Sequence, residues 1–199
     1  MTKSADGTLV PYFIFHSKKI KHNSKTPTIL YGYGGFEISL KPSYSATIGK
    51  LWLERGGAYA VANIRGGGEF GPRWHKAALK TKRQRAYDDF IAVAEDLNKP
   101  LIIHCRDSFS DVFDILSNRN LNNPIILHSW TGGNKWTKKF VELGVYFSIS
   151  GIVTYDTAHD LQAAVSKIPT DKLLLETDVP YLAPQPFKGK RNNPTYIKY

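Results

Sequence analysis

Residues 101–128 read LIIHCRDSFSDVFDILSNRNLNNPIILH, and this stretch decides the fold of the second half of the chain. It begins and ends with a short apolar run that a histidine follows, and a helix-length segment separates the two runs. Two more apolar runs occupy residues 145–149 and 173–175. Apolar runs that alternate with helical segments at this spacing are typical of βα units. The sequence therefore predicts four parallel strands with a helix after each of the first three.

Side chains that can bind a metal follow three of these runs. His104 and His128 end the first and second runs, and Asp178 comes shortly after the fourth. The carboxyl ends of parallel strands meet at one edge of a sheet, so we predict that these three side chains bind one divalent metal and that Asp178 is catalytic. If the fourth strand continues to Asp178, Glu176 lies on the same strand face, where it would orient a histidine or only make a polar contact. The alternative is that both histidines are hydrogen-bonded structural residues.

Four motifs in this half point to a family. They are His104-Cys105-Arg106-Asp107, His128-Ser129-Trp130-Thr131-Gly132, Glu176-Thr177-Asp178-Val179-Pro180-Tyr181-Leu182 and Arg191-Asn192-Asn193-Pro194. In this order and spacing, residues 98–199 resemble the C-terminal half of a TatD-type metal-dependent deoxyribonuclease. The resemblance implies half of a (β/α)8 barrel, divalent metal (Zn, Mn or Mg) and hydrolysis of phosphodiester bonds in DNA. The family's His-x-His pair and its bridging glutamate have no match before His104, so at most one metal ion per chain is expected.

The first half of the chain has its own α/β pattern. Strands are expected at residues 9–16, 28–33 and 58–64, and helices at residues 45–56 and 86–97. Pro11 assigns the first strand to a sheet edge, because proline cannot donate to a ladder. Ser45 is a suitable helix N-cap. A strand, a helix and a strand of this length predict parallel pairing of residues 28–33 with 58–64.

A second resemblance covers residues 2–97. It is carried by Asp6-Gly7-Thr8, Leu30-Tyr31-Gly32-Tyr33-Gly34-Gly35-Phe36, Ala60-Val61-Ala62-Asn63-Ile64-Arg65-Gly66-Gly67-Gly68-Glu69-Phe70-Gly71, Trp74-His75-Lys76 and Asp88-Asp89-Phe90. These motifs resemble the start of the peptidase domain of prolyl oligopeptidase, an α/β-hydrolase. The resemblance implies that Tyr33 is a vestigial oxyanion residue. The serine nucleophile of such enzymes lies in a Gly-x-Ser-x-Gly turn, which this sequence lacks, so serine peptidase activity is not expected.

The glycine run and the basic charge allow two further interpretations. Residues 66–71 contain four glycines, but no Gly-Lys-Ser/Thr follows them, so a phosphate-binding loop is not favoured. The net charge is +10, and residues 1–98 hold 15 Lys and Arg against 8 Asp and Glu. Such a surface binds nucleic acid or is simply a solvated basic face.

The sequence has no apolar signal or membrane segment, and Cys105 is its single cysteine. These features predict a cytoplasmic protein.

The junction between the two halves preserves the order of helix and strand. Pro100 ends the helix before residue 101, so an α/β-hydrolase-like segment at residues 1–97 would lead directly into a TIM-half-barrel-like (βα)4 segment at residues 98–199. The expected fold is α/β, with a mostly parallel twisted sheet that has helices on both faces and could run continuously through both halves. Otherwise the open edges of the half barrel would favour a homo-oligomer.

Three functions from different classes follow. The favoured hypothesis is a chimeric α/β protein without efficient native catalysis, which retains half of a TatD-type metal site. The second is a residual metal-dependent deoxyribonuclease, and the third is a basic module that binds DNA without cutting it.

Overall fold

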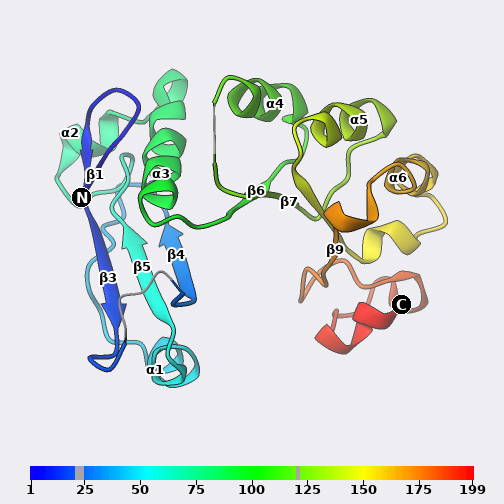
Figure 1. Cartoon of the computed structure of the whole chain (residues 1–199), viewed down its shortest axis with the longest axis horizontal. Helices are drawn as coiled ribbons and strands as arrows, with labels where there is room; N and C mark the ends of the chain where they lie inside the picture. Colours follow the sequence, from blue (N-terminus) through cyan, green and yellow to red (C-terminus); the bar gives the residue numbers. More distant parts are fainter. Residues whose placement is uncertain (21–24, 120–121) are drawn as a thin grey trace. The chain divides into compact units, whose positions relative to one another are not determined.

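The structure is a computed structural model that describes residues 1–20, 25–119 and 122–199. The chain forms two compact units, Met1–Lys99 and Pro100–Tyr199, which Figure 1 shows in blue to green and in green to red. Each unit has its own hydrophobic core.

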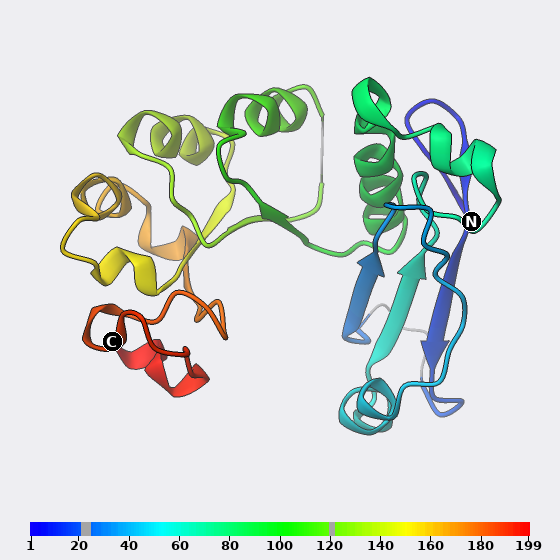
Figure 2. The same cartoon turned by 180° about the vertical axis from the view of Figure 1, so that it is seen from behind.

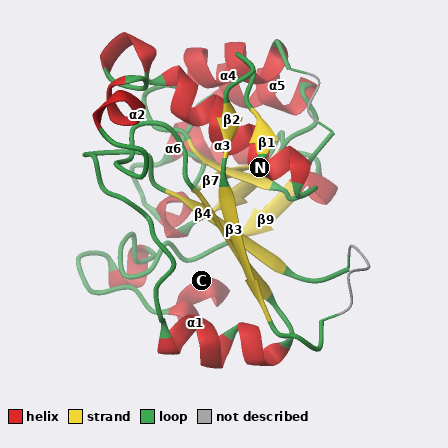
Figure 3. Cartoon of the chain, turned by 90° about the vertical axis from the view of Figure 1, so that its left-hand side faces the viewer, coloured by secondary structure: helices red, strands yellow, loops and turns green. Residues whose placement is uncertain are grey.

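The strands of the N-terminal unit form two small sheets. Figure 3 shows the chain from the side of this unit. The strands are β1 (Thr2–Lys3), β2 (Leu9–Val10), β3 (Tyr12–His16), β4 (Thr28–Gly32) and β5 (Ala58–Ala62). β1 pairs with β2, and the larger sheet has the order β3-β5-β4. The parallel pairing of β4 with β5 and the edge position of β3 confirm the prediction, and Pro11 separates β2 from β3.

Helices connect and cover these strands. They are α1 (Ala46–Leu51), α2 (Pro72–Lys76) and α3 (Gln84–Asp96), with short 3-10 helices at Leu53–Arg55 and Lys80–Lys82. Ser45 accepts a hydrogen bond from the Ile48 amide, as expected of an N-cap, and Gly56 ends the following turn with a φ of 88°. Apolar residues of α3 pack with β2 and β5 in the core of this unit: Val10, Ala62, Ile64, Ala78, Ala86 and Val93 are buried there.

A buried arginine fastens the loop after β5 to the N-terminal turn and to α3. Arg65 donates to both carboxylate oxygens of Asp89, at 2.6 Å and 2.9 Å, and to Asp6. Burial disfavours the charged guanidinium, but these carboxylates outweigh it and raise the pKa of Arg65, while the hydrogen bond from Arg65 holds the pKa of Asp6 well below its usual range. The network is structural, because every charged group in it already has a partner within the protein.

The glycine run after β5 does not present its amides to a ligand. The amides of Gly66, Gly67 and Gly68 donate to the carbonyls of Trp74, Ile64 and Ile38, respectively, and Gly71 donates to Gly68. Phosphate loops bind anions through free backbone amides. The disfavoured phosphate interpretation therefore gains no support.

The C-terminal unit contains a four-stranded parallel sheet. Its strands, in sheet order, are β6 (Leu101–His104), β7 (Ile125–His128), β8 (Tyr146–Ile149) and β9 (Leu173–Leu175). The helices between them are α4 (Phe109–Ser117), α5 (Asn134–Glu142) and α6 (His159–Val165). Four 3-10 helices are found at Gly151–Thr154, Thr170–Lys172, Gln185–Phe187 and Pro194–Lys198. The four predicted strands and three helices are thus present.

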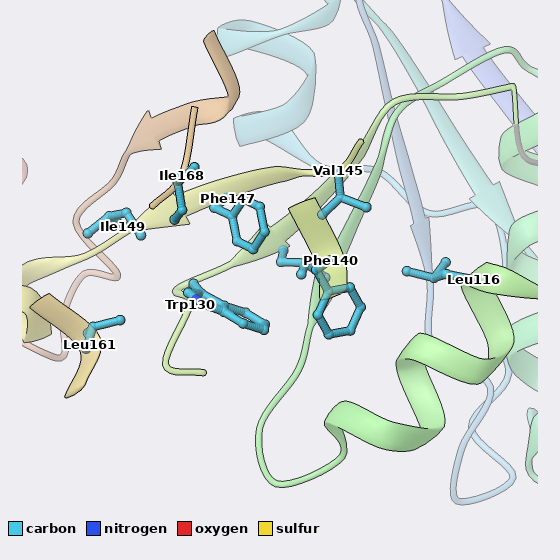
Figure 4. Packing of buried hydrophobic residues seen from close by; sticks show 9 residues of the cluster. Leu116, Trp130, Phe140, Val145, Phe147, Ile149, Leu161 and Ile168 are labelled. Atoms are coloured by element: carbon cyan, nitrogen blue, oxygen red, sulfur yellow. The ribbon is translucent and has the colours of Figure 1, made fainter. Parts of the chain in front are cut away.

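The core of this unit lies between the sheet and its helices. Trp130, Phe140 and Phe147 are at most 1% exposed, and their rings meet edge to face at centroid distances of 5.3 Å and 5.4 Å (Figure 4). Leu127 and Phe147 are register partners, so the core residues of neighbouring strands share one sheet face. α4 and α5 also lie side by side in Figures 1 and 2.

The structure distinguishes between the two arrangements of the sheet that the sequence left open. Among the described residues no strand pairing joins β3-β5-β4 to β6-β7-β8-β9, so the sheet is not continuous. Each strand of the C-terminal unit pairs instead with its neighbour in sequence, because a short crossover closes at low entropic cost. In this unit, apolar residues of α4, α5 and α6 pack against the sheet face of Leu127 and Phe147, so the expected cover of both faces is not found here. Right-handed crossovers that always advance in the same direction place every helix on one face.

Candidate metal centre at the strand ends

The predicted site lies on the face of the C-terminal sheet opposite the hydrophobic core. We call it the site face, and it comprises Ile102, His104, Ile126, His128, Tyr146, Ser148 and Leu174. These residues alternate with the core residues along each strand, since successive side chains point to opposite faces. His104 and His128 are register partners at the ends of β6 and β7, and their ring centroids lie 5.7 Å apart.

Two carboxylates flank the His128 ring. Nδ1 lies 2.9 Å from Oε2 of Glu176 and 2.8 Å from its Oε1, and Nε2 lies 3.5 Å from Oδ1 of Asp178. All three side chains are 22% to 30% exposed, so the cluster is accessible from solvent. Glu176 therefore contacts a histidine, and whether it orients a metal-binding ring stays a prediction.

Ser148 completes the arrangement behind the histidine. This residue is 4% exposed, and its hydroxyl donates to Oε2 of Glu176. The backbone amide of Glu176 also donates to the Ile149 carbonyl at 3.0 Å, which fixes the start of the segment after β9. A carboxylate at Nδ1 selects the tautomer whose Nε2 lone pair is free to bind a cation. Sequence reasoning missed Ser148, although a serine in the apolar strand β8 was a signal.

These side chains supply part of a metal shell. An Nε2 and an Oδ1 atom 3.5 Å apart can both reach one ion, since Zn–N and Zn–O bonds are about 2.0–2.2 Å long. Within residues 1–20, 25–119 and 122–199, however, no group of three or more His, Cys, Asp or Glu side chains is placed to hold a metal ion. Metal binding by His104, His128 and Asp178 therefore stays a prediction.

The residues after His104 are a buried cysteine and an exposed ion pair. Cys105 is 2% exposed, and burial raises the pKa of its thiol. Arg106 and Asp107 form an exposed ion pair with a nitrogen to oxygen distance of 3.8 Å.

The C-terminal tail packs against the segment that carries Asp178. The Asn192 amide donates to the Pro180 carbonyl at 2.9 Å, and its side chain donates to the Tyr181 carbonyl at 2.6 Å. A cavity of about 590 Å³ lies between the two segments and is lined by Val179, Pro180, Arg191, Asn192, Asn193, Pro194 and Tyr196. Asn192 therefore holds the loop beside the candidate site.

The predicted oxyanion residue belongs to the N-terminal unit. Tyr33 follows β4 and is 38% exposed. The assignment of Tyr33 as vestigial stays a prediction, and the sequence has no Gly-x-Ser-x-Gly turn for it to serve. No helix in the described part of the chain is both long and apolar enough to cross a membrane.

Comparison with known proteins identifies the family. The sequence model of the TatD related DNase family matches residues 41–199, and the chain belongs to this family. An uncharacterized metal-dependent hydrolase of Buchnera aphidicola is 35% identical over 179 residues, which cover 88% of this chain and 68% of the relative. The structure of a TatD homologue from Escherichia coli has a TM-score of 0.54 and 26% identity, and the match covers 59% of this chain and 46% of that one.

The chain is also similar to prolyl oligopeptidases. The prolyl endopeptidase of Elizabethkingia miricola is 52% identical over 96 residues, which cover 48% of this chain. The chain spans only 13% to 14% of the length of the first peptidases that it matches. The two resemblances predicted from the motifs are thus confirmed, and the TatD similarity begins earlier, at residue 41, than the motifs indicated.

Proposed function

We propose that this chain is a fusion of two hydrolase fragments that keeps half of a TatD-type metal site, and that a single chain is a poor catalyst. The observation that carries the proposal is the position of His128, which lies between the carboxylates of Glu176 and Asp178. Glu176 orients the ring, and Asp178 lies on the side of the free nitrogen.

The fold of the C-terminal unit supports this assignment. Four parallel strands in sequential order, with helices on one face, correspond to half of an eight-stranded (β/α)8 barrel, whose catalytic groups lie at the carboxyl ends of the strands. His104 and His128 occupy these ends, and Asp178 follows the last strand closely. Given the family, a phosphodiester bond of DNA is the proposed substrate.

Both halves lack parts that efficient catalysis needs. The peptidase-like part has no nucleophilic serine motif. The TatD-like part brings His128 and Asp178 together, but the described residues provide no third donor at the same point. We therefore expect weak metal binding and slow hydrolysis from an isolated chain.

Metal content and DNA cleavage test this function together. We expect about one Mn²⁺ or Zn²⁺ per chain at most, and loss of that ion from a His128→Ala/Asp178→Ala variant. His159→Ala is the matched control, because this histidine is exposed and belongs to α6, not to the end of a strand. Slow Mn²⁺-dependent cleavage of single-stranded DNA should disappear in the double variant and persist in the control. Equal metal content in all three proteins would refute the site.

A second function has an observation of its own. Lys76, Lys80 and Lys82 are exposed, and none of them has an ion-pair partner among the described residues. Exposed cations of this kind bind nucleic acid by releasing counterions. Salt-sensitive DNA binding that persists in EDTA and weakens in a Lys76→Ala/Lys80→Ala/Lys82→Ala variant would support a binding module.

A further inference from the structure

The site face carries apolar side chains that a folded unit normally buries. Ile102 is 68% exposed, whereas Leu101 before it is 3% exposed. In β9, Leu174 is 39% exposed and Leu175 is 66% exposed. Ile126 and Tyr146 lie between them in the sheet. An apolar strip of this kind across a sheet marks a surface that another structure covers.

Both edges of the same sheet are also open. Among the described residues β6 pairs only with β7, and β9 pairs only with β8. The outer edges of β6 and β9 therefore present backbone amides and carbonyls without strand partners. Such edges are templates for another strand. A strand that continues this all-parallel pattern next to β6 or β9 runs in the same direction as the four strands.

We propose that two copies of this chain associate through these edges and close an eight-stranded parallel barrel. β6 of each copy lies beside β9 of the other, and the two-fold axis runs along the barrel. A closed assembly satisfies both open edges of both copies at once and turns both site faces inward, where Ile102 and Leu174 become core residues. Closure stops the association at two copies, because each copy supplies half of the ring.

The amount of missing structure favours a second copy as the occupant. The part of this chain that matches the Escherichia coli TatD homologue covers 46% of that protein. The C-terminal unit has a four-stranded parallel sheet, so a second set of four βα strands completes an eight-stranded barrel. A different protein would need the same strand direction and two matching edges.

The assembly also supplies what the candidate site lacks. All eight strands point the same way, so the carboxyl ends of both sets lie at one mouth of the barrel. The partner's His104, the partner's His128 and the partner's Asp178 then surround the same opening as their counterparts. Shared metal binding rests on the proposed function, but the assembly itself does not, and it is measured in EDTA.

The first test measures mass in solution by sedimentation velocity in EDTA at several protein concentrations. We expect the mass of two chains, and we expect Ile102→Lys/Leu174→Lys to raise the dissociation constant by about a hundredfold or more, because the lysines would lose water in the interface. The matched control is Ile38→Lys/Tyr44→Lys, which changes two apolar residues of the N-terminal unit that are 48% and 93% exposed. Circular dichroism checks that each variant is folded. A monomer at every concentration, or a dimer that survives the Ile102→Lys/Leu174→Lys change, would overturn the proposal.

The second test reports which edges meet. In a Cys105→Ala background, Ile102→Cys and Leu174→Cys are made as separate single variants. The two-fold axis places identical strands on opposite sides of the barrel, so neither single variant should crosslink to itself on oxidation, whereas an equal mixture should give a covalent dimer. Crosslinking of a single variant, or none in the mixture, would contradict the pairing of β6 with β9. Loss of metal binding with an intact dimer would instead count against the proposed function alone.

Discussion

His128 is positioned by residues far away in the sequence. Glu176 is 48 positions further along the chain, and Ser148, which donates to Glu176, comes from a different strand. Because the hydroxyl and the imidazole both engage the same carboxylate, the ring has one defined orientation with Nε2 toward Asp178. Removal of the Ser148 hydroxyl or of the Glu176 carboxylate would therefore release the His128 ring, although the nitrogen of His128 and the oxygens of Asp178 would still be present.

The effect of substituting Arg65 on the free energy of unfolding depends on its buried environment. Its side chain is 4% exposed and its partner Asp89 is 0% exposed, so Arg65→Met would leave a buried carboxylate without its counter-ion. We expect this change to lower the free energy of unfolding of the N-terminal unit by about 3–5 kcal/mol. Lys50→Met removes a partner from the exposed Lys50–Glu54 pair and should cost below about 1 kcal/mol. Urea denaturation measures both, and equal small losses would show that Arg65 is not structurally important.

At the scale of elements, α5 illustrates how a helix is held by its aromatic face. Phe140 is fully buried, and its ring lies 5.4 Å from Trp130 and 5.5 Å from Phe113. Trp130 in turn donates to the Thr137 hydroxyl at 2.8 Å, which satisfies its indole N–H inside the core. The sheet and the helix therefore share one packed aromatic layer.

Truncation of this layer should be costly. We expect Phe140→Ala to lower the free energy of unfolding of the C-terminal unit by about 3–5 kcal/mol, through lost burial and the cavity that remains. Lys138→Ala, at an exposed position of the same helix, should change it by less than about 0.5 kcal/mol. The comparison uses urea denaturation followed by tryptophan fluorescence. A loss below about 1 kcal/mol in Phe140→Ala would mean that the layer can repack.

At the scale of the whole molecule, the chain contains two cores, one in each compact unit. Val93 is buried in the N-terminal core and Phe147 in the C-terminal core. We expect calorimetry to resolve two unfolding transitions, with Val93→Ala lowering the midpoint of one and Phe147→Ala lowering the midpoint of the other. A single transition that both variants lower equally would show that the two units unfold together.

The sequence alone determined the local structure and the family. The spacing of apolar runs predicted β6 to β9, Ser45 predicted the start of α1, and the strand-end motifs indicated TatD before any comparison. These features depend on residues close in the chain, where helix and strand periodicity and capping act.

Only the tertiary structure decided how these elements combine. It showed that the two sheets are separate, that the amides of the glycine run are already bonded, and that Ser148 stands behind Glu176. It also showed that His128 and Asp178 meet without a third donor among the described residues. The physical reason is that each strand edge and each polar group can pair with several segments that are distant in the sequence. Which of these pairings forms depends on the folded arrangement of the whole unit, and local sequence patterns do not specify it.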